Sequence, residues 1–357
     1  MFKTSNGMEI LSKRQSDALE FIRKNGAVGN QEIKEFLEKN FGGLSRITVV
    51  RDLDKLLKNG FIKKQGKGRT VSYSEAIGNK LLSYFDPQKY FEKDPDERII
   101  AFPNFNFEIF ENFSNLFSET ELENLRKLNS EYQERIKKIS PSILKKEHER
   151  LIIELSWKSS KIEGNTYSLI DTEVLIKDKK EAEGHSKEEA VMILNHKKAL
   201  DYIFSEKDKF KNISIRDVEN IHALLTGELN ITGGLRKRLV GITGTVFKPL
   251  DNQHQIHEAM EKMIALINKT TDPFAKALEA VLLVSYIQPF EDGNKRTARI
   301  LGNAILLAHN ACPLSYRSID EGDYKKAILL FYEQNSARFF KELFIAQFEF
   351  SVENYFL

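Results

Sequence analysis

The chain has 357 residues, more than a single hydrophobic core usually holds, so we expect two or three domains. It is 41% hydrophobic and 30% charged, which is typical of globular proteins, and no apolar run reaches the roughly 18 residues of a membrane span. The first residues lead into no hydrophobic signal core, so we expect a cytoplasmic protein with no membrane partner. With one cysteine, Cys312, the chain forms no internal disulfide.

Charge is distributed unevenly along the chain. Residues 1–75 contain fifteen Lys and Arg against nine Asp and Glu, a net charge of +6. The remaining residues contain 39 basic and 43 acidic side chains, a net charge of −4. This asymmetry predicts an anionic partner for the N-terminal segment.

The segment from Ser12 to Tyr73 predicts three helices followed by a β-hairpin. Asn30 and Ser45 are suited to cap the second and third helices, whose apolar residues recur at helical spacing. Residues 61–64 and 70–73 have strand character and flank a glycine-containing turn at 65–69. We therefore predict a compact module over residues 1–76.

This module resembles a winged helix-turn-helix of the DeoR-like kind, because residues 45–53, SRITVVRDL, are similar to the start of its recognition helix. The resemblance implies double-stranded DNA as a partner. The side chains expected at base edges are Arg46, Thr48 and Arg51, and those expected at phosphates are Lys63, Lys64, Lys67 and Arg69. The alternative is a winged helix that docks a protein and has a solvated basic face.

Residues 77–117 are predicted to be a linker and extension, because Asp86-Pro87 and Asp94-Pro95 are typical of turns. Periodicity leaves open whether residues 99–102 and 105–107 are extended pieces or core plugs. From residue 118 onward helical signals dominate, so residues 118–357 are predicted to form one α-helical domain. Its expected helix caps are Ser118, Ser140, Ser168, Ser186 and Ser214.

Residues 288–299, QPFEDGNKRTAR, combine features of a phosphate site. Asp292 offers an oxygen ligand for a divalent cation, and Gly293 allows backbone N–H groups to approach a phosphate. Arg296 and Arg299 lie one helical turn apart on the same face. The segment therefore predicts a site for a nucleoside triphosphate and Mg²⁺.

The same segment resembles the signature of the Fic family, H-x-F-x-[DE]-G-N-x-R-x-x-R, whose members mostly transfer AMP from ATP to a target hydroxyl. The resemblance implies a mainly α fold, with ATP and Mg²⁺ as cofactors and a Ser, Thr or Tyr hydroxyl of a protein, the chain itself included, as the acceptor. It places the metal at Asp292. It places the nucleotide at Phe290, Gly293, Asn294, Lys295, Arg296 and Arg299.

The leading signature position, where the family has its general-base histidine, is Gln288 in this chain. A Gln amide accepts no proton near neutral pH, and loss of a positioned base costs about 10²–10⁴-fold in rate. We therefore expect nucleotide binding with very slow transfer. A natural loss of catalysis and a deliberate His→Gln substitution fit the sequence equally.

Residues 159–165, SSKIEGN, resemble the family's inhibitory motif [ST]-x-x-x-E-[GN], at Ser159, Glu163 and Gly164. The resemblance implies an inhibitory helix around residues 150–164 and an ion pair between Glu163 and Arg299 that blocks the seat of the γ-phosphate. A carboxylate can occupy the guanidinium fork that a phosphate would otherwise take. The alternative is a helix that ends at Gly164 and has a solvated glutamate.

Residues 233–249 have the most strand-like character of the C-terminal region and resemble the family's β-hairpin flap, which aligns the target over the site by backbone pairing. The expected docking residues are Thr243, Gly244, Thr245, Val246 and Phe247. The alternative is an ordinary surface hairpin.

Three functions remain open on the sequence. The first is an auto-inhibited protein adenylyltransferase that has lost its base. The second is a non-catalytic, nucleotide-responsive DNA-binding regulator, and the third is a phosphotransferase of the Doc-like kind, suggested by Lys295. The seven histidines have no metal-ligand spacing. The oligomeric state stays open, a homodimer among the alternatives.

Overall fold

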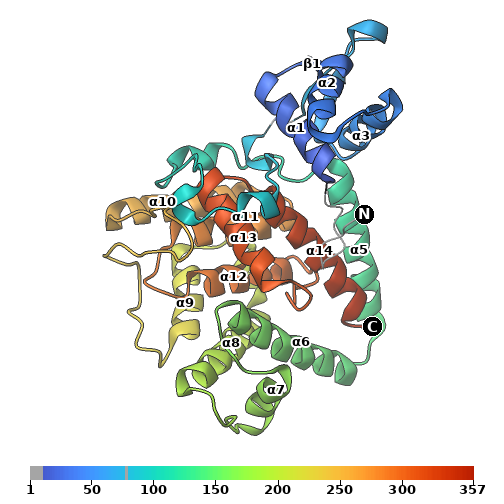
Figure 1. Ribbon diagram of the computed structural model, residues 1–357. Coiled ribbons are helices and arrows are strands. Elements are labelled where there is room, and N and C mark those ends of the chain that lie inside the picture. Colours follow the sequence, from blue (N-terminus) through green and yellow to red (C-terminus); the bar gives the residue numbers. More distant parts are fainter. Residues whose placement is uncertain (1–10, 77–78) are drawn as a thin grey trace.

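The computed structural model describes residues 11–76 and 79–357, and shows a small N-terminal unit beside a larger helical body (Figure 1). Each has its own cluster of buried apolar residues. The N-terminal unit contains a short 3₁₀ turn at Gly68–Thr70 and six other elements, which are α1 (Lys13–Asn25), β1 (Val28–Gly29), α2 (Asn30–Phe41), α3 (Arg46–Lys58), β2 (Ile62–Gln65) and β3 (Ser72–Glu75).

The three strands of this unit form one antiparallel sheet in the order β1-β3-β2. In β2 and β3, Ile62 pairs with Glu75 and Gln65 pairs with Ser72. The turn between them requires glycine, because Gly66 has φ +81° and a Cβ there would lie 2.3 Å from the Thr70 carbonyl oxygen. The predicted helices and the strand pair are confirmed, but Asn30 is already the first residue of α2 and Gly29 occupies the cap position.

The segment between the unit and the body packs against both, in contrast to a free linker. Its short helices are η2 (Lys80–Leu82), α4 (Pro87–Tyr90), η3 (Pro95–Glu97) and η4 (Phe107–Glu111). The Phe105 ring stacks on Tyr286 of the body at 4.6 Å between centroids. Of the residues that periodicity left open, Phe105 and Phe107 thus pack against the core of the body, whereas Ile99 is exposed.

The body is built from ten helices within the described residues: α5 (Glu119–Lys138), α6 (Pro141–Ile162), α7 (Leu169–Asp178), α8 (Lys187–Ser205), α9 (Ile215–Thr226), α10 (Gln253–Lys269), α11 (Pro273–Ile287), α12 (Asn294–Ala308), α13 (Glu321–Gln334) and α14 (Arg338–Asn354). The turn η5 (Lys207–Lys211) follows α8. All five predicted serine caps accept a hydrogen bond from the third residue of their helices.

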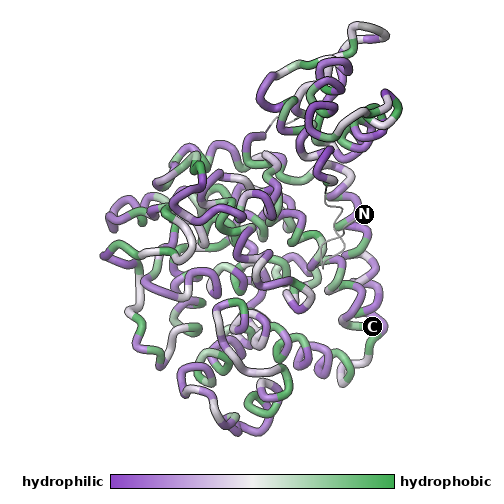
Figure 2. Tube along the Cα trace, viewed as in Figure 1, coloured by the Kyte–Doolittle hydropathy of each residue, from purple (hydrophilic) through white to green (hydrophobic). Residues whose placement is uncertain are grey.

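Helices α11 and α12 form the buried centre of the body, where every residue of α12 except Lys295 is buried. They approach closely because a Cβ on Gly302 would lie 2.6 Å from a methyl group of Val281. Around this pair the remaining helices alternate hydrophobic and hydrophilic residues, as amphipathic helices on a shared core do (Figure 2). Among the described helices, none is both long and apolar enough to cross a membrane.

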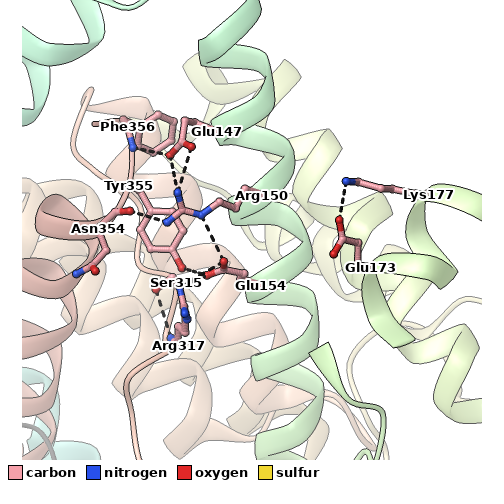
Figure 3. Close-up of polar contacts among 10 residues, drawn as sticks. All are labelled: Glu147, Arg150, Glu154, Glu173, Lys177, Ser315, Arg317, Asn354, Tyr355 and Phe356. Atoms are coloured by element: carbon pink, nitrogen blue, oxygen red, sulfur yellow. Dashed lines mark hydrogen bonds and ion pairs between the residues drawn. The ribbon is translucent and has the colours of Figure 1, made fainter. Parts of the chain in front are cut away.

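Helix α6 is fastened to the end of the chain by a polar network (Figure 3). The Glu154 carboxylate accepts hydrogen bonds from the Tyr355 hydroxyl and from Arg317 Nη1, the latter at 3.2 Å. Arg150 donates to the Asn354 carbonyl at 2.6 Å, and its guanidinium lies 4.6 Å from the centroid of the Tyr355 ring. These contacts fix the position of α6 and therefore of Glu163 at its C-terminal end.

Candidate functional site

The candidate site forms where the chain turns from α11 into α12. Gln288 ends α11 in the left-handed conformation (φ +51°), and Gly293 precedes α12 with φ +80°. A Cβ on Gly293 would lie 3.1 Å from the Thr226 methyl group, so the turn leaves little room for a side chain there. The two left-handed residues bend the chain sharply, so the N-terminal end of α12 lies at the site.

The Gln288 amide is buried and fully engaged. Its Nε2 donates to the Ser285 carbonyl at 2.6 Å and to the Tyr332 hydroxyl at 3.1 Å, and its Oε1 accepts from Asn294 Nδ2 at 3.0 Å. Asn294 also closes the turn, because its side chain exchanges two hydrogen bonds of 2.8 Å with the backbone of Phe290. Gln288 and Asn294 thus brace the turn together.

Arg296 and Arg299 bring two guanidinium groups into the interior, with exposed fractions of 2% and 0%. Arg296 Nη2 donates to Asp292 at 2.9 Å. Arg299 donates from Nε to Ser159 Oγ and from Nη2 to the Ser159 carbonyl, both at 2.9 Å, and it lies 5.2 Å from the centroid of the Tyr324 ring. In each arginine Nη1 is buried and has no hydrogen-bond partner among the residues that the structure describes. Two buried cations with unused donors make a site for an anion.

The predicted ion pair between Glu163 and Arg299 is confirmed. Glu163 Oε1 lies 2.8 Å from Arg299 Nη2, and Glu163 Oε2 lies 3.8 Å from Lys295 Nζ. Burial by itself would raise the pKa of the Glu163 carboxyl, but the charges of Arg299 and Lys295 hold that pKa below its usual value. Gly164, with φ +101°, then turns the chain away from α6. Glu163 thus places a carboxylate on one donor of the buried Arg299 guanidinium.

Asp292 has an exposed side chain, 68% accessible, and its carboxylate meets only Arg296 among the described side chains. No group of three or more His, Cys, Asp or Glu residues suited to a metal occurs in the described part of the chain. One carboxylate fits Mg²⁺, which proteins hold through one or two carboxylates together with water and substrate phosphates. A single carboxylate does not suit a cation whose ligands all come from the protein.

Two buried residues that sequence reasoning did not select hold the turn in place. His222 of α9 stacks on Phe290 at 3.8 Å between centroids, and its Nε2 donates to the Asp292 carbonyl at 2.9 Å. Burial lowers the pKa of His222 to about 4, so the ring is neutral. Arg236 donates from its backbone N–H to the Pro289 carbonyl at 2.9 Å and from Nε to the Gln288 carbonyl. The sequence gives no signal for these roles, because all three hydrogen bonds are to backbone carbonyls.

The predicted β-hairpin at residues 233–249 is wrong. These residues contain no strand pair, and Lys248 forms an isolated parallel bridge with Asn104 of the connecting segment. The Arg236 guanidinium instead donates to the carbonyl of Arg238 inside this stretch and to that of Leu250 directly after it. Of the predicted docking residues, Phe247 is buried and stacks on Tyr286, whereas Val246 is 41% exposed. Thr243 and Gly244 form a turn, and Thr245 Oγ1 accepts from the Phe247 N–H at 3.0 Å.

The residues predicted to contact DNA lie in the N-terminal unit. Arg46 and Arg51 are exposed on α3, where Thr48 is partly buried, and Lys63, Lys64 and Lys67 are exposed on β2 and the turn after it. The side chain of Arg69 lies outside the described residues. The structure thus gives two separate candidate surfaces, the buried arginine site of the body and the basic face of the N-terminal unit.

Comparison with known proteins assigns the central part of the body. Residues 212–306 match the model of the Fic/DOC family, and this range includes α9 to most of α12. The chain is 31% identical over 172 residues to "Protein adenylyltransferase Fic" of Nematostella vectensis, a match that covers 47% of this chain and 40% of that protein. The protein of the same name from Drosophila melanogaster is 29% identical over 149 residues, covering 41% and 30%. The chain thus spans less than half the length of these relatives.

Solved structures share the fold at low identity. Fic-1 (residues 134–508) from C. elegans superposes with a TM-score of 0.59 at 18% identity and covers 97% of this chain and 98% of its own. A Fic domain containing signaling protein from Bacteroides thetaiotaomicron has a TM-score of 0.56 at 20% identity, covering 64% and 94%. Together with the family match, these likenesses support a Fic domain in the helical body.

Proposed function

From the Fic domain that residues 212–306 indicate, we propose that this chain binds ATP with Mg²⁺ in the machinery of a protein adenylyltransferase, and that Gln288 makes transfer very slow. The observation that carries the proposal is the pair of buried guanidinium groups, Arg296 and Arg299, each with an unpartnered Nη1 at the start of α12. Unused donors on a buried cation are costly unless a ligand supplies an acceptor. A polyphosphate supplies several acceptor oxygens.

The nucleotide phosphates would lie across the turn before α12. Arg296 and Arg299 would offset charge on the outer phosphates, while the backbone N–H groups from Gly293 to Lys295 would donate to phosphate oxygens. Asp292 would hold Mg²⁺, which would supply positive charge to offset the charge of the phosphates. Phe290 is buried against His222, so its part is to shape the turn that carries these groups.

The transfer would join a target hydroxyl oxygen to the α-phosphorus and break the bond to pyrophosphate. The hydroxyl proton must pass to a base as the bond forms, and an amide at position 288 does not take it. Both ends of the Gln288 amide are also already hydrogen-bonded, Nε2 to Ser285 and Tyr332 and Oε1 to Asn294. We therefore expect nucleotide binding to survive while transfer is slowed by about 10²–10⁴-fold.

Glu163 would restrain the same site by competition. Its carboxylate lies 2.8 Å from Arg299 Nη2, the position that a phosphate oxygen would take. Removing the carboxylate would free that nitrogen without disturbing the two bonds from Arg299 to Ser159. Glu163→Gly is therefore expected to raise Mg·ATP affinity by about tenfold or more, the effect of one charge-assisted contact. Glu181→Gly, which removes an exposed acid from a loop, is the charge-matched control.

Transfer is tested with ATP labelled in turn at the α- and γ-phosphate. The unchanged protein, Gln288→His and Gln288→His/Glu163→Gly are each incubated with Mg·ATP and with lysate proteins. Label from the α-position should appear on protein only in the histidine variants, and most strongly in the double variant. Transfer of γ-label instead would identify a phosphotransferase, and label in neither variant would refute the adenylyltransferase proposal.

A second candidate function rests on the N-terminal unit. Its helices and three-stranded sheet follow one another in the order of a winged helix, and Arg46 and Arg51 are exposed on α3, the helix in the recognition position. We propose that this face contacts double-stranded DNA. Arg46→Ala/Arg51→Ala should then weaken duplex binding and reduce its dependence on salt. Lys39→Ala, an exposed charge on α2, should have a smaller effect, and an equal effect of both would count against a role for α3.

A further inference from the structure

A second buried histidine, His196 of α8, is linked to Arg299 through one serine. His196 and Ser159 both have an exposed fraction of 0%. His196 Nε2 lies 2.8 Å from Ser159 Oγ, and the same oxygen lies 2.9 Å from Arg299 Nε. The three side chains, from α8, α6 and α12, therefore form a continuous line of hydrogen bonds inside the body.

The direction of each hydrogen bond follows from the other end of the imidazole. His196 Nδ1 lies 2.9 Å from the Met192 carbonyl, which only accepts, so Nδ1 carries the proton. Burial, together with the nearby charges of Arg296 and Arg299, lowers the pKa of His196 to about 3, so the ring is neutral and Nε2 has a free lone pair. The Ser159 hydroxyl must therefore donate to Nε2.

That donation determines how Ser159 meets Arg299. A serine hydroxyl has one proton and two lone pairs, so once its proton points at His196 the oxygen is held as an acceptor. The hydroxyl oxygen accepts a hydrogen bond from Arg299 Nε, and the Ser159 carbonyl accepts one from Arg299 Nη2. Without an acceptor at position 196, the hydroxyl is free to rotate, and the interaction with the guanidinium loses its fixed geometry.

These contacts orient Arg299 independently of Glu163. Glu163 accepts only from Nη2, while Ser159 accepts from both Nε and Nη2, and within the described part of the chain Nη1 has no hydrogen-bond partner. When the Glu163 carboxylate leaves, both bonds to Ser159 remain and the guanidinium keeps its plane. The arginine is then preorganised for an incoming anion, which lowers the entropic cost of binding it.

We propose that His196 is a positioning residue for the nucleotide site: it accepts the Ser159 proton and thereby holds Arg299 in the orientation that receives a phosphate. The proposal rests on the proposed nucleotide binding, and it adds to that site a residue from outside the signature segment and outside the motif of Ser159 and Glu163.

The test measures Mg·ATP affinity by calorimetry in the Glu163→Gly background, where the competing carboxylate is gone. Four further changes are compared in that background: Ser159→Ala, His196→Phe, His196→Gln and Ser159→Ala/His196→Phe. Phe keeps the ring volume without an acceptor, whereas Gln has an amide oxygen that accepts from Ser159. Circular dichroism and thermal unfolding check that each variant is folded.

His196→Phe and Ser159→Ala should each lower affinity by about tenfold, the effect of one hydrogen bond to a charged group. The double variant should lose no more than either single variant, because both changes break the same line of contacts. His196→Gln should bind within about twofold of the parent. Unchanged affinity in His196→Phe, or a double variant that loses the product of the two single effects, would overturn the proposal.

A ligand-free measurement separates this proposal from the proposed function. The Arg299 Nε–H signal in ¹H–¹⁵N spectra is identified by its loss in Arg299→Lys. It should shift in Ser159→Ala and in His196→Phe and stay in place in His196→Gln. If the Glu163→Gly parent binds no Mg·ATP, the nucleotide function fails, and these spectra still decide whether His196 positions Arg299: a signal that does not move refutes it.

Discussion

Glu279 on α11 is a buried carboxyl group with too few partners to stay ionised. It is 2% exposed, its Oε1 accepts from Thr270 at 3.1 Å, and its Oε2 has no hydrogen-bond partner among residues 11–76 and 79–357. Burial raises the pKa of Glu279 to about 8, although Lys276 opposes the rise. The group is therefore protonated in the folded chain and ionised in the unfolded chain at neutral pH.

The sign of the resulting pH dependence follows from linkage. A carboxyl whose pKa is raised on folding contributes stability that is fully present below the unfolded value of about 4.5 and is lost as the pH rises toward about 8. Glu279→Gln keeps the shape without the ionisation. It should match the unchanged protein near pH 4.5 and be more stable by about 3 kcal/mol at pH 7, at about 1.4 kcal/mol per pH unit. Equal denaturant midpoints at both pH values would contradict this.

At the same scale, the sequence predicted contacts between residues of known chemical type better than contacts to the backbone. The ion pair between Glu163 and Arg299 was expected from the resemblance of both segments to motifs of one family, and the structure contains it. Arg236, His196 and His222 were missed, because each meets a backbone carbonyl whose position depends on the fold. A local pattern does not record such partners. The roles of the site residues in binding and inhibition remain predictions.

The element that decides the position of Glu163 is α6, and its anchor is Glu154. Glu154 is nine residues before Glu163 on one helix and accepts from Tyr355, Arg317 and Arg150 (Figure 3). Glu154→Gln keeps the size of the side chain and removes the charge that these donors share. The loss should be about 2–3 kcal/mol of unfolding free energy, as for hydrogen bonds to charged groups in a buried network.

The matched control for this change is Glu173→Gln on α7. Glu173 pairs with Lys177 at 2.7 Å, but both side chains are nearly half exposed, so its loss should cost about 0.5 kcal/mol or less. Urea unfolding measures both variants, and hydrogen exchange of residues 141–162 should accelerate only in Glu154→Gln. If both variants lose equal stability, the hydrogen bonds of Glu154 do not anchor α6.

Elements were predicted where the signal is local and were missed where backbone partners are distant. Caps such as Ser118 and Ser186 gave the starts of α5 and α8, because the capping contact closes within four residues. The hairpin expected around Thr243 and Gly244 failed, because the partner of Lys248 is Asn104, more than a hundred residues earlier. Strand-like composition indicated an extended chain there, but not what it would pair with.

At the scale of the whole molecule, the connecting segment joins the N-terminal unit to residues 244–248 of the body. On one side, Arg23 of α1 donates to the Tyr84 carbonyl at 2.6 Å, and Lys89 lies 2.8 Å from Glu20. On the other side, the Lys248 N–H donates to the Pro103 carbonyl at 2.9 Å. The segment predicted as a linker is thus a packed strut between the two candidate surfaces.

Arg98 is the residue on which this strut depends. It is 4% exposed, pairs with the fully buried Glu333 at 2.8 Å, and donates to the Gly244 carbonyl as well. Arg98→Lys keeps the charge beside Glu333 but replaces the guanidinium fork, so one side chain no longer reaches both partners. Hydrogen exchange should accelerate by about tenfold at residues 244–248 and also at 84–91, since both ends of the strut lose the same support.

Arg126→Lys is the control for this change, because Arg126 also pairs with a carboxylate, Asp272 at 3.0 Å, but is 54% exposed on α5. It should leave exchange at residues 244–248 unchanged. Faster exchange confined to residues near position 98 would show that the segment does not act as one strut. Acceleration at both ends would mean that the two ends of the segment are coupled. Binding of a ligand to the N-terminal unit could then affect the candidate site through existing contacts, because coupling between two sites acts in both directions.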